Sequence, residues 1–177
     1  MSIQAGTHSI GPSNGSLRIM TGKEGAAAKM GHDLVLVVNS WEGTVDVGDS
    51  TSVSLTADPG SVEVESGSGG AKPLSDKDKA DIKKSINGKV LGSSQITFKS
   101  SEASFDGGSG SVRGDLSIAG KSDSVNVPLQ ISDSGKVSGR LTLNQSNYGI
   151  KQLSAMMGAL KVKDAVTVEF EATLPTG

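Results

Sequence analysis

Three neighbouring segments between residues 94 and 131 alternate between apolar and polar side chains. Their apolar positions are Ile96 and Phe98, then Val112, Leu116 and Ile118, then Val125, Val127, Leu129 and Ile131. Successive side chains of a strand point to opposite faces, so a period of two predicts a sheet with one apolar face. The gaps between segments are too short for a helical crossover, which predicts antiparallel pairing. We expect this stretch to be the centre of an all-β domain.

Composition supports the same class and excludes several functions. The chain has 177 residues with 24 glycines, and only 3% of its residues are aromatic, which is typical of a turn-rich β protein. A formal net charge of −2 and the lack of a basic run interleaved with aromatics argue against nucleic-acid binding. Because the chain has no cysteine, disulfides and thiolate metal sites are excluded.

Similar segments elsewhere, such as residues 32–38, 40–47 and 166–170, bring the expected total to about eight or nine strands. Eight antiparallel strands can close into a barrel that holds one small ligand, and closure removes exposed edges. We therefore predict a closed antiparallel barrel of about eight strands. It forms a single domain over residues 16–177, after a flexible lead-in over residues 1–15.

One helix is expected over about residues 76–90. Ser75 followed by Asp78 is a capping-box-like start. The apolar residues of this segment lie four apart and form one thin stripe: Ile82, Ile86 and Val90. In an otherwise all-β chain, such a stripe is expected to rest across a barrel mouth or a sheet edge. A second, short helical segment is expected near residues 150–158.

The start of the chain has neither the basic nor the apolar region of a secretory signal. The longest apolar run, residues 34–38, is far too short to span a membrane as a helix. We therefore expect a cytoplasmic protein without a membrane span.

No motif in the sequence predicts catalysis or metal binding. Residues 11–15 have the Gly-x-Ser-x-Gly spacing of a nucleophile elbow, but a polar segment precedes them and a strand follows. Residues 76–81 depart from a calcium loop, since Ala80 and Asp81 stand where a ligand and a glycine are required. Two histidines without a cysteine make no zinc cluster. We predict no catalytic residue, no metal, no cofactor and no enzymatic activity.

Several motifs, in order, are similar to those of a known family. They are QITFKS at residues 95–100, VRGDLSI at 112–118 with Gly120, NYGI at 147–150 followed by Val162, Asp164 and Val166, and WEGTV at 41–45. With this order and spacing the chain resembles the YceI-like family of bacterial lipid-binding barrels over roughly residues 16–174. It departs from the family pattern at Ala119, where the family often has His, and over residues 75–86.

The resemblance implies a lipocalin-like barrel that holds a polyisoprenoid or similar amphiphile. It also implies a binding protein without established catalysis, often exported and often a homodimer. The function predicted for this chain is a carrier for a polyisoprenoid, an isoprenoid quinone or a fatty-acid-like lipid. The alternative is a structural or protein-interaction barrel with a filled core and no ligand, since small barrels are often filled.

The same apolar side chains serve both alternatives, as cavity lining or as core. They are Leu34, Leu36, Val38, Trp41, Val45, Phe98, Leu116, Ile118, Leu129, Leu143, Met156 and Phe170. His32, Lys121 and Tyr148 are the candidates for contacts to a ligand head group.

Overall fold

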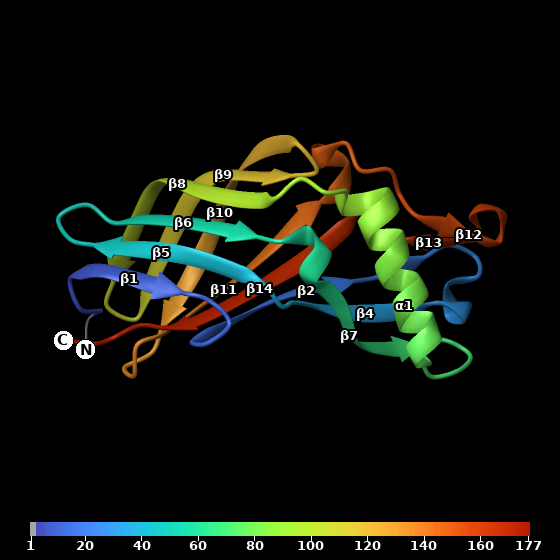
Figure 1. Cartoon of the computed structure of the whole chain (residues 1–177), viewed down its shortest axis with the longest axis horizontal. Coiled ribbons are helices and arrows are strands. Elements are labelled where there is room, and N and C mark those ends of the chain that lie inside the picture. Colours follow the sequence, from blue (N-terminus) through green and yellow to red (C-terminus); the bar gives the residue numbers. More distant parts are fainter. Residues whose placement is uncertain (1–2) are drawn as a thin grey trace.

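The computed structural model describes residues 3–177, which form one large antiparallel sheet, one small sheet and one α-helix (Figure 1). In order across the large sheet, the strands are β1 (Gly6–Ile10), β5 (Trp41–Val47), β6 (Ser52–Ala57), β8 (Ile96–Asp106), β9 (Ser109–Ile118), β10 (Lys121–Ile131), β11 (Lys136–Asn144), β14 (Ala165–Thr173), β2 (Gly15–Thr21), β4 (His32–Val38) and β7 (Val62–Gly69). The small sheet contains β12 (Ser154–Ala155), β13 (Leu160–Val162) and β3 (Lys23–Glu24). The prediction of a mainly antiparallel β protein with one helix is confirmed.

The centre of the sheet is the stretch that the alternating pattern singled out. β8, β9 and β10 pair antiparallel, with Phe98 opposite Leu116 and Val112 opposite Val127. A two-residue turn of Ala119 and Gly120 joins β9 to β10, with φ angles of 52° and 79°. Positive φ at both residues is what a tight hairpin requires if the twist of its strands is to continue.

The prediction of a closed barrel of about eight strands is wrong. The eleven-stranded sheet curls into a half-barrel whose end strands, β1 and β7, share no hydrogen-bonded ladder in the described part of the chain. Three short connections cross between the two sides of the opening instead: residues 11–14, 39–40 and 58–61. Two of them bond to each other, since the Asn39 amide donates to the Ser61 carbonyl (3.2 Å) and the Asp58 amide to the Ser40 carbonyl (3.0 Å). These connections thus link the two edges of the sheet, which strand pairing would join in a closed barrel.

The segment predicted to be a lead-in, residues 1–15, contains a strand. β1 pairs with β5 from Gly6 opposite Val47 to Ile10 opposite Gly43, and Ile10 is buried. The turn that follows includes the Gly-x-Ser-x-Gly motif, where the Asn14 side chain accepts a bond from the Gly11 amide (2.9 Å) and donates one to the Ser9 carbonyl (3.0 Å). The motif is therefore an ordinary turn between two strands. Residues 1 and 2 of the predicted lead-in lie outside the described residues.

Helix α1 (Asp76–Ser85) continues as a π-helical segment, η3 (Ile86–Leu91), so the two together match the helix expected over residues 76–90. The predicted capping box is present: the Asp78 amide donates to Ser75 Oγ (3.1 Å), and the Ser75 amide donates to Asp78 Oδ2 (3.0 Å). These bonds hold the pKa of Asp78 below its usual value, because they favour the charged carboxylate. The cap thereby fixes where the helix starts.

The helix packs against β7 at one end of the half-barrel (Figure 1). Lys83 Nζ donates to the Gly60 carbonyl (3.0 Å) and to Glu63 Oε1 (3.2 Å), while Ile86 and Leu91 are buried. The apolar stripe therefore rests on the sheet, as expected. Among residues 3–177, no helix is long and apolar enough to cross a bilayer.

The prediction of a helical segment near residues 150–158 is wrong, except that one 3₁₀ turn forms there. The chain there forms β12 and the three-residue 3₁₀ turn η5 (Met156–Gly158), and the other 3₁₀ turns are η1 (Ala28–Met30), η2 (Pro59–Ser61) and η4 (Gln145–Tyr148). Met156 and Met157 have positive φ angles of 53° and 57°, which interrupt a right-handed helix. Apolar composition alone was therefore a poor guide to this segment.

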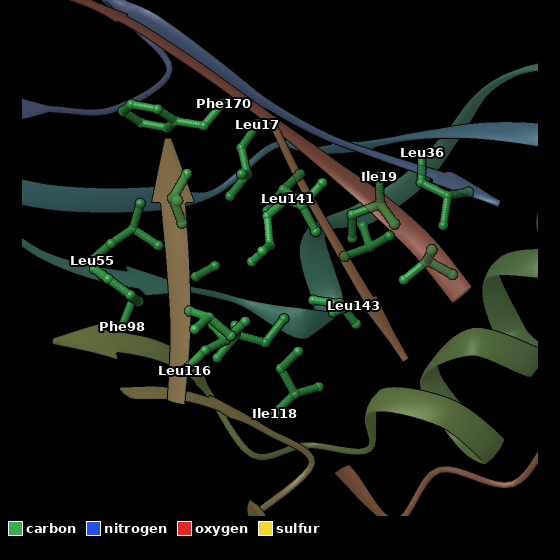
Figure 2. Close-up of a pocket in the computed structure, with 18 of the residues that line it drawn as sticks. Leu17, Ile19, Leu36, Leu55, Phe98, Leu116, Ile118, Leu141, Leu143 and Phe170 are labelled. Carbon is green, nitrogen blue, oxygen red and sulfur yellow. The ribbon is translucent and has the colours of Figure 1, made fainter. Parts of the chain in front are cut away.

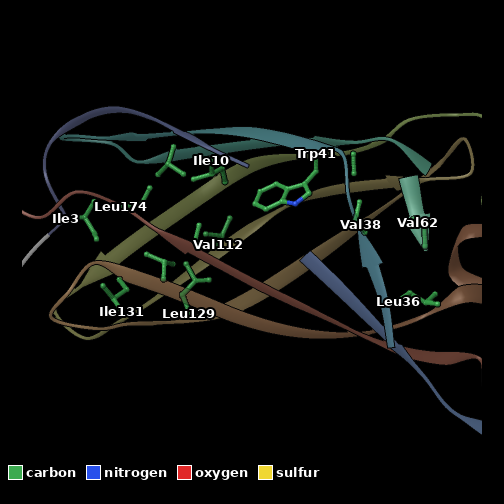
Figure 3. Close-up of a cluster of buried hydrophobic side chains, with 14 of the residues drawn as sticks. Ile3, Ile10, Leu36, Val38, Trp41, Val62, Val112, Leu129, Ile131 and Leu174 are labelled. Atoms are coloured by element: carbon green, nitrogen blue, oxygen red, sulfur yellow. The ribbon is translucent and has the colours of Figure 1, made fainter. Parts of the chain in front are cut away.

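A hydrophobic core fills the part of the half-barrel near the chain termini. Figure 3 shows Ile3, Ile10 and Leu174 there together with Ile131 and Leu129. Trp41 belongs to the same cluster, and its ring meets Phe170 edge to face, with centroids 6.0 Å apart. Such an arrangement stabilises an aromatic pair beyond the area it buries.

Candidate ligand-binding cavity

The concave face of the sheet and α1 surround a cavity of about 500 Å³. Figure 2 shows side chains from β2, β4, β6, β8, β9, β11 and β14 that point toward a common space. Those labelled are Leu17, Ile19, Leu36, Leu55, Phe98, Leu116, Ile118, Leu141, Leu143 and Phe170. Because inward positions alternate along each strand, the apolar face of the whole curled sheet becomes one continuous wall. The interior is therefore not filled throughout.

Very few polar side chains reach this cavity. The lining is aliphatic or aromatic apart from Gly139 and four polar residues, Thr21, Asp81, Ser85 and Gln145. Thr21 Oγ1 accepts a bond from the Leu34 amide (3.3 Å), and Gln145 Nε2 donates to the Lys163 carbonyl (3.1 Å), so both already have partners. Of the lining residues, only Asp81 of α1 is itself exposed.

Ten of the twelve side chains proposed from the sequence as cavity lining do line this space. They are Leu34, Leu36, Val38, Val45, Phe98, Leu116, Ile118, Leu129, Leu143 and Phe170. Trp41 is buried in the core beside the cavity rather than facing it. Met156 is 54% exposed in η5, where its φ angle is 53°, and it does not line the cavity.

Other lining residues, on β2, β6, β11, β14, α1 and η3, were not predicted from the sequence. Among them are Leu17, Ile19, Leu55, Leu141, Val168, Ile82 and Ile86. Each lies at an alternating strand position or on the helix stripe, so the signal was present in the sequence. The pattern did not show which apolar positions face open space and which pack into the core.

The three head-group candidates do not meet at the cavity. His32 Nε2 lies 2.7 Å from the Lys72 carbonyl, in a contact with the loop before α1. Lys121 follows the β9–β10 turn, and its side chain lies against Gly149. None of the three, Tyr148 included, is among the residues that line the cavity.

Tyr148 has an unusual environment of its own. It is 1% exposed, and its hydroxyl has no hydrogen-bond partner within the described residues. The buried Oδ1 atom of Asn87 on η3 also has no hydrogen-bond partner there. Burial, with a smaller contribution from the negative charge of Asp123, raises the pKa of Tyr148 to about 12. Tyr148 therefore packs as a core residue with Leu143 and Ile150.

The charged side chains of the described residues lie outside the core. No cluster of three potential metal ligands occurs among residues 3–177, and no polar or charged residue in that part of the chain is buried. Asp78, one of the three aspartates near the start of α1, is committed to the helix cap. What this arrangement offers a ligand is apolar surface.

A curled antiparallel sheet around an apolar cavity places the chain among the barrel-like proteins whose interior is suited to a small apolar ligand. Residues 13–174 match the model of the YceI-like domain, and the chain belongs to this family. The resemblance drawn from the sequence motifs is therefore confirmed.

Solved structures agree with this assignment at the level of the fold. BcnA of Burkholderia cenocepacia aligns with a TM-score of 0.66 and 19% identity, over 91% of this chain and 96% of that one. The YceI protein of Campylobacter jejuni aligns with a TM-score of 0.53 and 14% identity, over 80% of this chain and 85% of that one. No curated protein matches the chain.

Proposed function

We propose that this protein is a non-catalytic carrier that holds a long apolar ligand in its half-barrel. The ligand class is a polyisoprenoid, an isoprenoid quinone or a fatty-acid-like lipid. The observation that carries the proposal is the cavity of about 500 Å³. Only four of the side chains that line it are polar, so an occupant would contact mainly apolar surface. Pockets for small molecules fall in the range of about 300–1,000 Å³.

The driving force would be the transfer of the apolar chain out of water. Each buried methylene contributes about 0.8 kcal/mol, so about ten of them contribute about 8 kcal/mol. That corresponds to micromolar affinity, before the cost of ordering the chain is subtracted. A polar head group would remain beside Asp81, the exposed residue of the cavity lining.

The same features favour binding over catalysis. General acid–base or nucleophilic chemistry needs positioned groups with perturbed acidity inside a pocket. The polar lining side chains here are an aspartate at the surface, a serine, and a threonine and a glutamine that already have partners. The alternative of a filled core is disfavoured by the volume left open between the sheet and α1.

The proposal is tested by native mass spectrometry and organic extraction of the purified protein. We expect a reproducible mass excess that extracts as one class of apolar lipid. The same spectra report whether the protein is a homodimer, as expected from the family. A protein without bound lipid that also shows no thermal shift with isoprenoid quinones or fatty acids would contradict the carrier role.

A chain-length series makes the test quantitative. Affinity for saturated fatty acids should rise about fourfold per added methylene, the equivalent of about 0.8 kcal/mol, until the cavity is full. Beyond that length the gain per methylene should fall, because further carbons remain in water. An affinity independent of chain length would mean that the acids bind elsewhere on the protein.

A further inference from the structure

Three methionines are the large hydrophobic side chains that the described part of the protein exposes to solvent. Met30 is 52% exposed, Met156 54% and Met157 fully, at 106% of its reference area. All other large apolar residues of the described chain are at least partly covered. Exposed apolar side chains that belong to one part of an otherwise well-packed protein are a sign of an interaction site.

The three methionines belong to one end of the molecule. β13 pairs with β3, with Lys161 opposite Glu24, and the Ala27 amide donates to the Ala159 carbonyl (2.8 Å). Figure 1 shows the resulting projection at the same end of the sheet as α1. We call residues 23–31 and 151–163 together the methionine tip.

Two of the three methionines lie on strained backbone. Met156 and Met157 both have left-handed φ angles, 53° and 57°, which are unfavourable for residues other than glycine. Their side chains are not drawn into the core by this conformation, since both are exposed. Strained backbone that presents an apolar side chain to water is consistent with a functional role.

The charge of the tip differs from that of the rest of the protein. It carries five lysines and one glutamate, in a chain whose formal net charge is −2. The lysines are Lys23, Lys29, Lys151, Lys161 and Lys163. Asp33 and Asp164 flank the tip, and the Asp164 carboxylate already accepts bonds from Ser146. The tip is thus both apolar and basic.

The tip is continuous with the cavity wall. Leu153 and Val162, which lie within it, line the cavity, as do Thr21 and Leu34 on the neighbouring strands β2 and β4. Asp81 of α1, the exposed residue of the cavity lining, belongs to the same end of the molecule. A surface that seats against the tip therefore lies close to this part of the lining.

We propose that the methionine tip docks on an anionic phospholipid bilayer, so that the carrier exchanges its ligand with a membrane. This inference rests on the proposed carrier function. The methionine side chains enter the interfacial region, while the lysine ammonium groups stay at the level of the lipid phosphates. Lysine-rich surroundings favour a bilayer over a protein partner, because lysine is depleted at protein–protein interfaces.

Vesicle sedimentation tests the docking with the full chain. The protein should bind vesicles of equal parts phosphatidylcholine and phosphatidylglycerol, bind pure phosphatidylcholine more weakly, and lose binding to the mixed vesicles at high salt. The double variant Met156→Ser, Met157→Ser should bind about tenfold more weakly. Lys29→Gln and Lys151→Gln should each cost about fivefold. Lys136→Gln is the matched control, since Lys136 begins β11 at the opposite end of the sheet and should not change binding.

A site-specific label identifies the surface that inserts. Because the chain has no cysteine, Met157→Cys takes a single environment-sensitive dye, and Asn126→Cys on an exposed position of β10 serves as the control. Only the dye at position 157 should shift to the blue with mixed vesicles. Equal shifts at both positions, no vesicle binding, or binding unaffected by the methionine and lysine changes would overturn the docking proposal.

Ligand binding in vesicle-free solution separates this proposal from the carrier function. If a fluorescent fatty acid binds the protein but vesicles do not, the docking proposal alone fails. If vesicles bind and no apolar ligand enters the cavity, the carrier function fails and the tip is a membrane site of another protein class.

Discussion

Replacing Leu141 with tryptophan should block the cavity without harming the fold. Leu141 points from β11 into the open space (Figure 2), and tryptophan adds about six heavy atoms there. If the indole displaces about four ligand methylenes, it removes about 3 kcal/mol of binding free energy, or more than a hundredfold in affinity. Because the indole enters open volume, the free energy of unfolding should change by less than about 1 kcal/mol.

The assay combines displacement of a fluorescent fatty acid with urea unfolding. Thr142→Trp is the matched control, since the neighbouring residue is exposed on the outer face of β11 and should leave affinity unchanged. Leu141→Ala should retain binding, and its loss of unfolding free energy should fall below the ~2–5 kcal/mol of a fully packed leucine, because the side chain borders open volume. A destabilisation of about 1–3 kcal/mol by Leu141→Trp, with no effect on binding, would show overpacking of a filled core and refute the reasoning.

Three further outcomes are expected from other parts of the fold. Trp41→Ala should lower the free energy of unfolding by about 3–5 kcal/mol in urea, because it removes a buried ring packed on Phe170; a loss below about 1 kcal/mol would contradict its role in the core. Ser75→Ala should lower the free energy of unfolding by about 1 kcal/mol and speed amide exchange in α1. Ser75→Asp keeps an acceptor at the cap and should do neither. Equal exchange in both variants would argue against the cap. Tyr148 is neutral when protonated and its folded pKa is raised, so its contribution to stability is complete below about pH 10 and is lost as the pH rises through about 12. Tyr148→Phe should make that alkaline loss smaller, and because Tyr148 is the single tyrosine, tyrosinate absorbance reports its titration directly; a midpoint near pH 10 would refute the buried hydroxyl.

Strands with regular alternation were predictable, and those without it were not. β8 was recognised only from Ile96 and Phe98, because its register shifts between Ser100 and Glu102 and moves the later side chains out of phase. Phe105, beyond the shift, nevertheless lines the cavity. β1 was missed altogether, since its sequence GTHSI is polar and the strand is stabilised by its ladder with β5.

Local chemistry likewise identified the helix but not the loop near residue 156. The reciprocal bonds of Ser75 and Asp78 are encoded within four residues, so the start of α1 could be read from the sequence. Met156 and Met157 lie in the loop that joins β12 to β13, and β13 also pairs with β3, which is far away in the chain. Their exposure therefore became visible only in the folded structure.

The amino-acid sequence by itself determined the period-two pattern, the antiparallel pairing of β8 to β10, the capped helix and the family. Each of these depends on neighbours in the chain or on motifs in a fixed order. Only the tertiary structure decided that the sheet stays open between β1 and β7, that Trp41 fills core while Leu141 faces a cavity, and that three exposed methionines belong to one end of the molecule. Those outcomes depend on which distant strands pair and how much volume their side chains leave, which no local pattern specifies.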